Sequence, residues 1–239
     1  MITSWKEEAG AGVTFAEGFV AAGVRAGLKS EGKDVALIVA DSAATVAGVF
    51  TTNRVQAACV QYSRKIVKSG TARAIFVNAG NANACNGEQG EADNSMLADW
   101  VSRRLHIAPD SVLTASTGII GHLLPMEKLE GGIAEAVEGL DRGNEIDMTL
   151  AHAIMTTDTR PKMRAVEVDS DQWVAPIRFG GMCKGAGMIA PNMATMLAFI
   201  TTDVRIPAPL LQEALGRAAA VSFLSLIHIS EPTRLRRIS

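Results

Sequence analysis

Short runs of apolar and β-branched residues recur along the chain, and each run ends at glycine, asparagine, aspartate or threonine. Such runs are typical of buried strands bounded by turns. The sequence therefore predicts strands at residues 34–41, 45–52, 72–80 and 111–121. A further apolar run, TMLAFI, predicts a strand that begins at Thr195. The glycine-rich stretch before it, residues 178–192, is expected to be a long loop, and long ordered loops are often functional.

Apolar residues at helical spacing lie between these runs. Residues 90–105 form one apolar stripe with i, i+3 and i+4 spacing, and either Asp93 or Asn94 is a candidate cap for its start. Further helices are predicted at residues 126–140, 149–158 and 207–223. The first of these is weakened by a Gly-Gly pair. The mixture predicts an α/β protein built from layered sheets covered by helices.

Composition narrows the class of protein. The 239 residues are 48% hydrophobic and only 5% aromatic, and the formal net charge is -2. Without a basic stripe or aromatic stacking platforms, we expect no nucleic-acid partner. The first residues lack the pattern of a signal peptide, and no apolar run approaches the ~20 residues of a membrane span. We therefore expect a cytoplasmic protein that does not bind membranes.

The sequence offers little for metal binding. Cys59, Cys85 and Cys183 lie far apart with no C-x-x-C pair, which argues against a disulfide framework or a zinc site. We expect all three to be small buried apolar residues. The four histidines show no ligand spacing either, so no structural metal is expected.

One apparent nucleotide motif is incomplete. Residues 27–33 have the glycine and lysine spacing of a phosphate-binding loop, but Asp34 stands where serine or threonine would hold Mg²⁺. No clear strand precedes it, so a surface turn is the preferred interpretation. The chain also lacks a G-x-S-x-G elbow, and a Ser-His-Asp triad has no support.

Polar residues at the ends of predicted elements are the remaining candidates. Thr117 and Gly118 end a strand, where a hydroxyl and an open backbone N–H are the equipment of an oxyanion hole. Residues 156–158 follow a predicted helix, and Lys184 stands among glycines, where it could bind a carboxylate. Each also has an ordinary explanation: a strand-end turn, a helix stop and a solvated lysine. Thr195 is either a half-buried strand residue or a nucleophile at a strand end.

Together, several blocks of sequence resemble a known family. In order along the chain they are GFVAAGVRAGLK (18–29), AGVFTTNRVQAA (47–58), NAGNANACNGEQG (78–90), STGIIG (116–121), MTTDTRPK (155–162) and KGAGMIAPNMATMLAFITTD (184–203). These blocks resemble the ornithine acetyltransferases, also called glutamate N-acetyltransferases. The resemblance covers roughly residues 13–223.

The resemblance implies a self-cleaving protein of the N-terminal-nucleophile type with an αββα-like fold. The bond to be cut would join Ala194 to Thr195. The Thr195 hydroxyl would attack the preceding carbonyl, and water would hydrolyse the resulting ester. The freed α-amino group, with a pKa of about 7.7–8.0 in model peptides, could then act as the base for Thr195 as nucleophile.

The resemblance also implies roles for other residues. Thr117 and Gly118 would form the oxyanion hole, and Thr157, Lys184 and Thr195 would bind substrate. A cationic Lys184 suits an α-carboxylate. Acetyl would pass from N-acetylornithine to glutamate in arginine biosynthesis. No cofactor would be bound, although some members use acetyl-CoA as donor, and the two pieces would assemble as a heterotetramer with two copies of each.

Two other hypotheses stay open at this point. A related self-cleaving amidohydrolase would pass the acyl group to water, and a non-catalytic binding module would keep the fold without the chemistry. The TTDTRPK and KGAGMIAPNM blocks favour the transferase.

The resemblance also divides the chain. Residues 1–194 would be the first piece, and residues 195–223 would begin the second. Residues 224–239 start with LSLIHISEPTR, which looks like the translation of a transposase library adapter, with a divergent natural terminus as the alternative. We accordingly expect the 239-residue chain to be inactive alone and poorly folded near its C-terminal end.

Overall fold

The computed structural model describes residues 2–186 and 196–222. The strands of this part are β1 (Ile2–Glu8), β2 (Phe19–Val24), β3 (Val35–Thr45), β4 (Thr71–Asn81), β5 (Val112–Ile119), β6 (Lys162–Ser170), β7 (Ile177–Lys184) and β8 (Leu197–Thr202). The helices are α1 (Ala58–Val67), α2 (Gly87–Leu105), α3 (Met126–Glu138), α4 (Asn144–Ala153) and α5 (Ala208–Val221), with the short 3-10 helix η1 (Pro109–Ser111).

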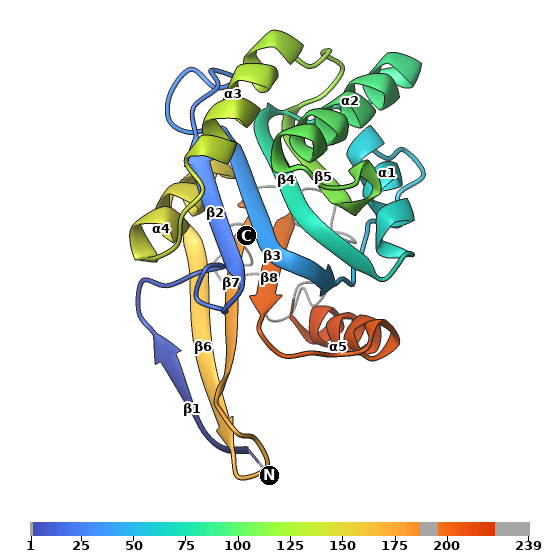
Figure 1. Cartoon of the computed structure of the whole chain (residues 1–239). Helices are drawn as coiled ribbons and strands as arrows, with labels where there is room; N and C mark the ends of the chain where they lie inside the picture. Colours follow the sequence, from blue (N-terminus) through green and yellow to red (C-terminus); the bar gives the residue numbers. More distant parts are fainter. Residues whose placement is uncertain (1, 187–195, 223–239) are drawn as a thin grey trace, which may run out of the picture.

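The strands form two four-stranded sheets (Figure 1). In the first sheet the order is β2-β3-β4-β5, and only β4 and β5 are parallel. Helix α2 lies in the crossover between these two strands, as a parallel pair requires. The second sheet has the order β1-β6-β7-β8 and is antiparallel throughout.

The first sheet separates two apolar cores. On one face, Leu37 and Phe76 pack with Leu97 of α2 and Ile133 of α3, and all four are fully buried. Burying each such side chain contributes about 1.5–3 kcal/mol. The alternation of side chains along a strand sends the neighbouring residues, such as Ile38, to the opposite face.

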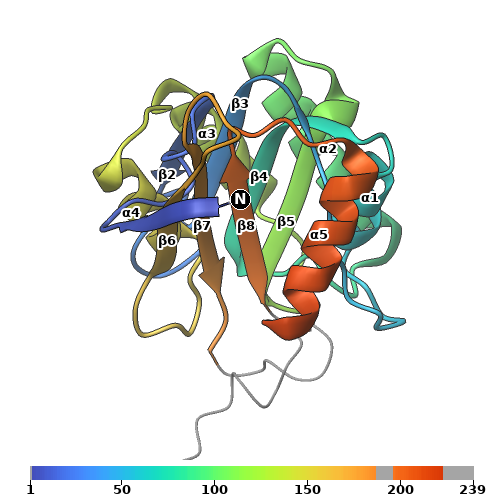
Figure 2. The same ribbon diagram turned by 90° about the horizontal axis from the view of Figure 1, so that it is seen from below.

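That opposite face packs against the second sheet. Ile38 and Val77 share a core with Leu150 of α4, Met182 of β7 and the half-buried Phe199 of β8. Figure 2 shows β6, β7 and β8 lying across from β2–β5, with α2 and α3 on the far side of the first sheet. The expected α/β class, with layered sheets covered by helices, is confirmed.

A backbone contact sets how closely the loop after β1 approaches the second sheet. A Cβ atom at Gly180 in β7 would lie 1.9 Å from the carbonyl oxygen of Gly12. The loop is held by the buried carboxylate of Asp147 in α4, which accepts the N–H groups of Gly12 at 2.7 Å and Thr14 at 2.9 Å. The loop therefore needs both the missing side chain and the buried charge.

Two element predictions were wrong. Residues 46–52 are irregular, because β3 ends at Thr45 and a side-chain amide occupies the place of a strand neighbour. Gly48 donates its N–H to Gln212 Oε1 at 3.0 Å, and its carbonyl accepts from Gln212 Nε2 at 3.1 Å. The stretch 178–192 is not all loop, since β7 runs to Lys184 with alternating burial and pairs on both sides.

The other elements agree better with the predictions. The strands at 34–41, 72–80 and 111–121 are confirmed as β3, β4 and β5, and the apolar run after Thr195 forms β8. The helices at 90–105, 126–140 and 207–223 are confirmed as α2, α3 and α5, whereas α4 lies about five residues earlier than expected.

Asp93 and Asn94 do not cap α2, because the helix begins at Gly87 and both side chains lie buried in its interior. Asp93 instead accepts a hydrogen bond from Gln89 Nε2 at 2.7 Å, four residues before it.

Alanine at Gly180 should destabilise the fold by about 1–3 kcal/mol, because the added methyl group meets backbone that has no room to move. The matched control is Gly131→Ala in α3, where no atom lies within 4 Å of the new Cβ. That change should stabilise by about 1 kcal/mol through helix propensity. Urea unfolding midpoints measure both. A Gly180→Ala chain as stable as the parent would contradict the contact.

Candidate active site

A buried lysine lies where three elements of the fold meet. Lys184 is the last residue of β7 and is only 3% exposed. Its Nζ donates to Thr117 Oγ1 at 3.1 Å and to Thr156 Oγ1 at 2.6 Å. Thr117 comes from the end of β5, and Thr156 comes from the turn after α4. Alternation along β7 turns Met182 and Lys184 toward the first sheet, which explains the burial.

Burial changes the acidity of this ammonium group. Desolvation lowers the pKa of Lys184 below its ordinary value, the Asp158 carboxylate acts in the opposite direction, and Lys162 adds to the lowering. In its charged form the ammonium has three N–H donors, and the two threonine hydroxyls accept two of them. Within the described residues the third donor has no partner, so it could bind an anionic group.

Thr117 and Gly118 lie together at the end of β5, as the sequence predicts. Gly118 is exposed, has a φ of +135°, and pairs with Gly80 of β4. A Cβ at Gly118 would come within 2.3 Å of the Gly80 carbonyl carbon. Only glycine therefore fits, and the backbone here remains accessible.

The two peptide groups that flank Gly185 are held beside the lysine by an ion pair. The Asp158 Oδ1 atom accepts the Gly185 N–H at 2.8 Å and is also bonded to Lys162 Nζ. Lys162 Nζ in turn donates to the Gly185 carbonyl at 3.0 Å. Burial acts to raise the pKa of Asp158, but the hydrogen bonds from Lys162 and Gly185 and the charges of Lys162 and Lys184 outweigh it, so the pKa is lowered.

In the incomplete phosphate motif, a carboxylate of the chain itself occupies the place of an anion. The carboxylate of Asp34, which is fully buried, accepts the backbone N–H groups of Ala26, Gly27, Leu28 and Lys29 at 2.6–3.0 Å. The N–H groups that a phosphate would need are thus filled by the chain's own side chain. This agrees with rejecting a nucleotide site here.

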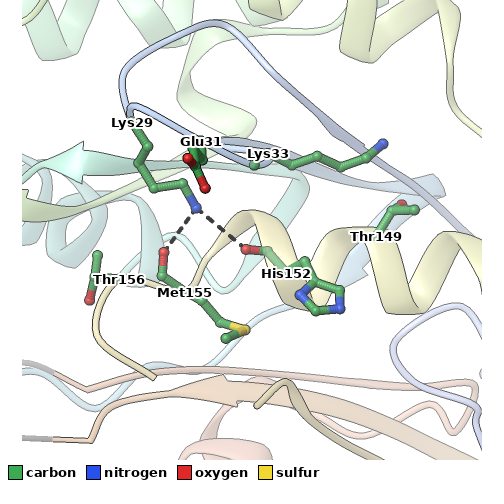
Figure 3. Close-up of a pocket in the computed structure, with 8 residues that line it drawn as sticks. Lys29, Glu31, Lys33, Thr149, His152, Met155 and Thr156 are labelled. Carbon is green, nitrogen blue, oxygen red and sulfur yellow. Dashed lines mark hydrogen bonds between the residues drawn. The ribbon is translucent and has the colours of Figure 1, made fainter. Parts of the chain in front are cut away.

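The same loop is tied to the turn that carries Thr156. Lys29 Nζ donates to the carbonyls of Met155 at 3.0 Å and His152 at 3.5 Å, whereas Lys33 points away from them (Figure 3). Burial lowers the pKa of Lys29, the Asp34 carboxylate opposes this, and the charge of Lys184 adds to the lowering.

A pocket of about 400 Å³ opens between this loop and α4, with Thr156 at its edge. Thr156, whose hydroxyl accepts from Lys184, is therefore one of the residues that line an open space.

Thr195 and Ala194 lie outside the described residues, so their predicted roles stay predictions. The residues on either side of that segment do meet at the lysine. Leu197 pairs with Lys184, and a Cβ at Gly185 would lie 3.4–3.5 Å from Met196 atoms.

The two neighbouring threonines are placed differently. Thr156 contacts Lys184, whereas Thr157 is exposed and its side chain makes no hydrogen bond within the described part of the chain. The role of Thr157 in substrate binding stays a prediction. The sequence did mark residues 156–158 as a polar cluster, but it did not assign Thr156, Asp158 or Lys162. No local signal could have done so, because their partners lie 23 to 28 residues away or belong to the same ion pair.

The three cysteines differ in how deeply they are buried. Cys59 is buried as expected and Cys183 is partly so, but Cys85 is exposed, because it lies in a loop with a φ of +63°. Within residues 2–186 and 196–222, no group of three or more acidic, cysteine or histidine side chains could hold a metal. No helix in these ranges is long and apolar enough to span a bilayer.

Comparison with known proteins identifies the family. The model of the ArgJ family matches residues 20–229, and the chain belongs to this family. The match includes residues 224–229, so the predicted foreign tail from residue 224, which lies outside the described residues, stays a prediction.

Curated relatives are close in sequence but longer. The chain is 46% identical over 214 residues to the arginine biosynthesis bifunctional protein ArgJ of Synechocystis sp., covering 88% of this chain and 51% of that protein. It is 48% identical over 215 residues to the ArgJ protein of Bifidobacterium longum, covering 88% and 54%. The chain thus spans about half the length of the curated relatives it matches.

Two solved structures share the fold. The ornithine acetyltransferase of Mycobacterium tuberculosis, solved in complex with ornithine, matches with a TM-score of 0.72 and 40% identity, covering 80% of this chain and 100% of that chain. The ArgJ protein of Bacillus halodurans also matches with a TM-score of 0.72, at 33% identity, covering 80% and 98%.

The lysine network predicts different costs for the two threonines. Thr156→Val removes the shorter of the two hydrogen bonds of a buried ammonium, so we expect a loss of about 1–3 kcal/mol. Thr157→Val, at an exposed position, should change stability by less than about 0.5 kcal/mol. Denaturant unfolding of both variants at pH 7 compares them, and equal losses would refute the assignment of Thr156.

Proposed function

We propose that this chain carries part of the active site for transfer of an acetyl group from N2-acetylornithine to glutamate. Thr195 is the nucleophile, freed by self-cleavage of the Ala194–Thr195 bond. The observation that carries the proposal is the buried Lys184, bonded to Thr117 and Thr156 at the strand end from which the chain leads to Thr195. Family membership supports the reaction class.

The hydrogen-bond directions at the lysine support an oxyanion hole at Thr117. An ammonium only donates, so Thr117 Oγ1 is the acceptor, and within the described residues its own O–H proton has no acceptor. That proton and the backbone N–H of the exposed Gly118 would be the two donors that a tetrahedral oxyanion needs. Lys184 adds a positive charge behind the hydroxyl, which strengthens it as a donor.

The same lysine suits the substrates. N2-acetylornithine and glutamate share an α-carboxylate, and the third N–H of Lys184 is a charge-assisted donor for it. Thr156, at the edge of the open pocket, supplies a second free hydroxyl proton by the same argument. The next residue, Thr157, is exposed, and we propose that it also binds substrate.

Self-cleavage needs no reagent other than one water molecule, and hydrolysis of the ester returns the Thr195 hydroxyl. The Thr195 hydroxyl adds to the Ala194 carbonyl, the C–N bond breaks as the amine takes a proton, and water hydrolyses the ester to a carboxylate. The Thr195 α-amino group is then available as the base for acetyl transfer.

We also propose a cellular role and an assembly for the full-length protein. The protein acts in the cytoplasm in arginine biosynthesis, holds no bound cofactor, and has acetyl-CoA as a further donor. Its two pieces assemble as a heterotetramer with two copies of each. Sedimentation of a cleaved full-length protein tests the assembly, and activity with acetyl-CoA alone as donor tests the second reaction.

Substitution of Thr195 tests the mechanism in a full-length version of the chain. The parent should run as two fragments, the second beginning Thr-Met-Leu. Thr195→Ala should remain one chain and transfer no acetyl, because the hydroxyl is lost, whereas Thr195→Ser should still be cut. Intact mass and N-terminal sequencing measure cleavage, and ornithine release with glutamate as acceptor measures transfer.

Two results would overturn the proposal. An uncut Thr195→Ala protein with normal transfer would remove Thr195 from the mechanism. A cleaved parent that releases acetate from N2-acetylornithine at the same rate with or without glutamate would instead be a hydrolase.

A further inference from the structure

The ion pair between Asp158 and Lys162 binds the backbone on both sides of Gly185. Asp158 accepts the Gly185 N–H, which belongs to the Lys184–Gly185 peptide group, and Lys162 donates to the Gly185 carbonyl, which belongs to the next peptide group. The Asp158 side chain is 1% exposed, whereas that of Lys162 is 36% exposed. The φ and ψ angles of Gly185 lie between these two peptide groups, so they cannot change without breaking a charge-assisted hydrogen bond.

These two peptide groups lie directly after Lys184, so the ion pair can affect the geometry of the site. Gly185 follows the buried Lys184 directly and lies against Met196, the residue after Thr195. With a φ of +145°, Gly185 adopts a backbone conformation that only glycine tolerates well. A residue with so little intrinsic preference needs external contacts to fix its conformation, and the ion pair supplies them.

We propose that Asp158 and Lys162 are positioning residues, which fix the two peptide groups that flank Gly185 and thereby set the direction of the Lys184 side chain and the direction in which the chain leaves β7. Among the described residues, their side chains bond to each other and to Gly185, and not to Lys184 itself. The proposal rests on the proposed acetyl transfer, and it assigns Asp158 and Lys162 of the TTDTRPK block a function of their own.

The pair also tunes the charge of the lysine. Among the described residues, Asp158 and Lys162 act on the pKa of Lys184, and the charge of Lys184 in turn lowers the pKa of Lys29 in the loop before β3. Asp158 raises the pKa of Lys184, and Lys162 lowers it. Removal of the carboxylate must therefore lower that pKa, and removal of the Lys162 charge must raise it. These opposite shifts follow from charge alone, so they test whether the pair acts on Lys184, whereas cleavage and kcat/KM test whether the pair positions Gly185.

The test uses a full-length version of the chain with Asp158→Asn, Lys162→Met and Lys162→Arg. The Asp158→Asn and Lys162→Met chains should be cleaved more slowly and lose about 10- to 100-fold in kcat/KM for glutamate, because the two peptide groups that flank Gly185 are no longer fixed. Lys162→Arg keeps the charge and the donors, and it should stay within about threefold of the parent. The alkaline limb of the pH profile, where Lys184 loses its proton, should move to lower pH in Asp158→Asn and to higher pH in Lys162→Met.

The control is a second ion pair with the same i, i+4 spacing. Arg103 bonds to Asp99 at 2.8 Å on the surface of α2, far from the lysine in sequence, and Arg103→Met should change neither cleavage nor the pH profile. If Asp158→Asn fails to fold, the comparison of Lys162→Met with Lys162→Arg still decides.

Two outcomes are distinguishable. A parent that neither cuts nor transfers acetyl refutes the proposed function. An active parent whose Asp158→Asn and Lys162→Met variants keep full activity refutes the positioning role, and alkaline limbs that shift in the same direction refute the action of the pair on the pKa of Lys184.

Discussion

The buried ammonium of Lys184 is the constraint on which the site depends. An isolated charge inside a protein costs several kcal/mol, so the fold must bring acceptors to it. Thr117 and Thr156 meet this need from the end of β5 and from the turn after α4. Because β7 belongs to one sheet and β5 to the other, satisfying one lysine also fixes how the ends of the two sheets approach each other.

Buried carboxylates hold the irregular segments around this lysine. Asp34 accepts four backbone N–H groups of the loop that carries Lys29, and Asp147 accepts two from the loop after β1. Asp158 does the same for Gly185. Hydrogen bonds to charged groups contribute about 1.5–3 kcal/mol each, more than those between neutral groups. The loops that have no strand neighbour are thus ordered by charge, so that Lys29 and Gly185 reach the site in one geometry.

Apolar periodicity is local, so the sequence predicted β3, β4, β5, β8 and the helices α2, α3 and α5, but it missed β1, β2, β6 and α1 and could not supply the partners of any element. The stretch at 45–52 has a strand-like composition, yet Gln212 takes its backbone groups from 164 residues away. Residues 178–184 look like a loop by glycine content, yet Gly180 is required where β7 meets a backbone carbonyl. The sequence marked the polar clusters that contain Thr117, Thr156 and Lys184, and the structure brings these three residues together. Which threonine reaches Lys184 depends on where α4 ends, and that boundary is set by packing of the helix against β2 and β3.

The pairing of β7 with β8 explains how this architecture tolerates a break in the chain between them. The two strands are antiparallel neighbours joined through six residue pairs, from Phe179–Thr202 to Lys184–Leu197. Thr201 Oγ1 also donates to the Val13 carbonyl at 2.6 Å, and Phe199 packs into the core between the sheets. None of these contacts depends on a covalent link between the strands. The proposed cleavage of the Ala194–Thr195 bond would therefore leave β8 held in its sheet beside β7.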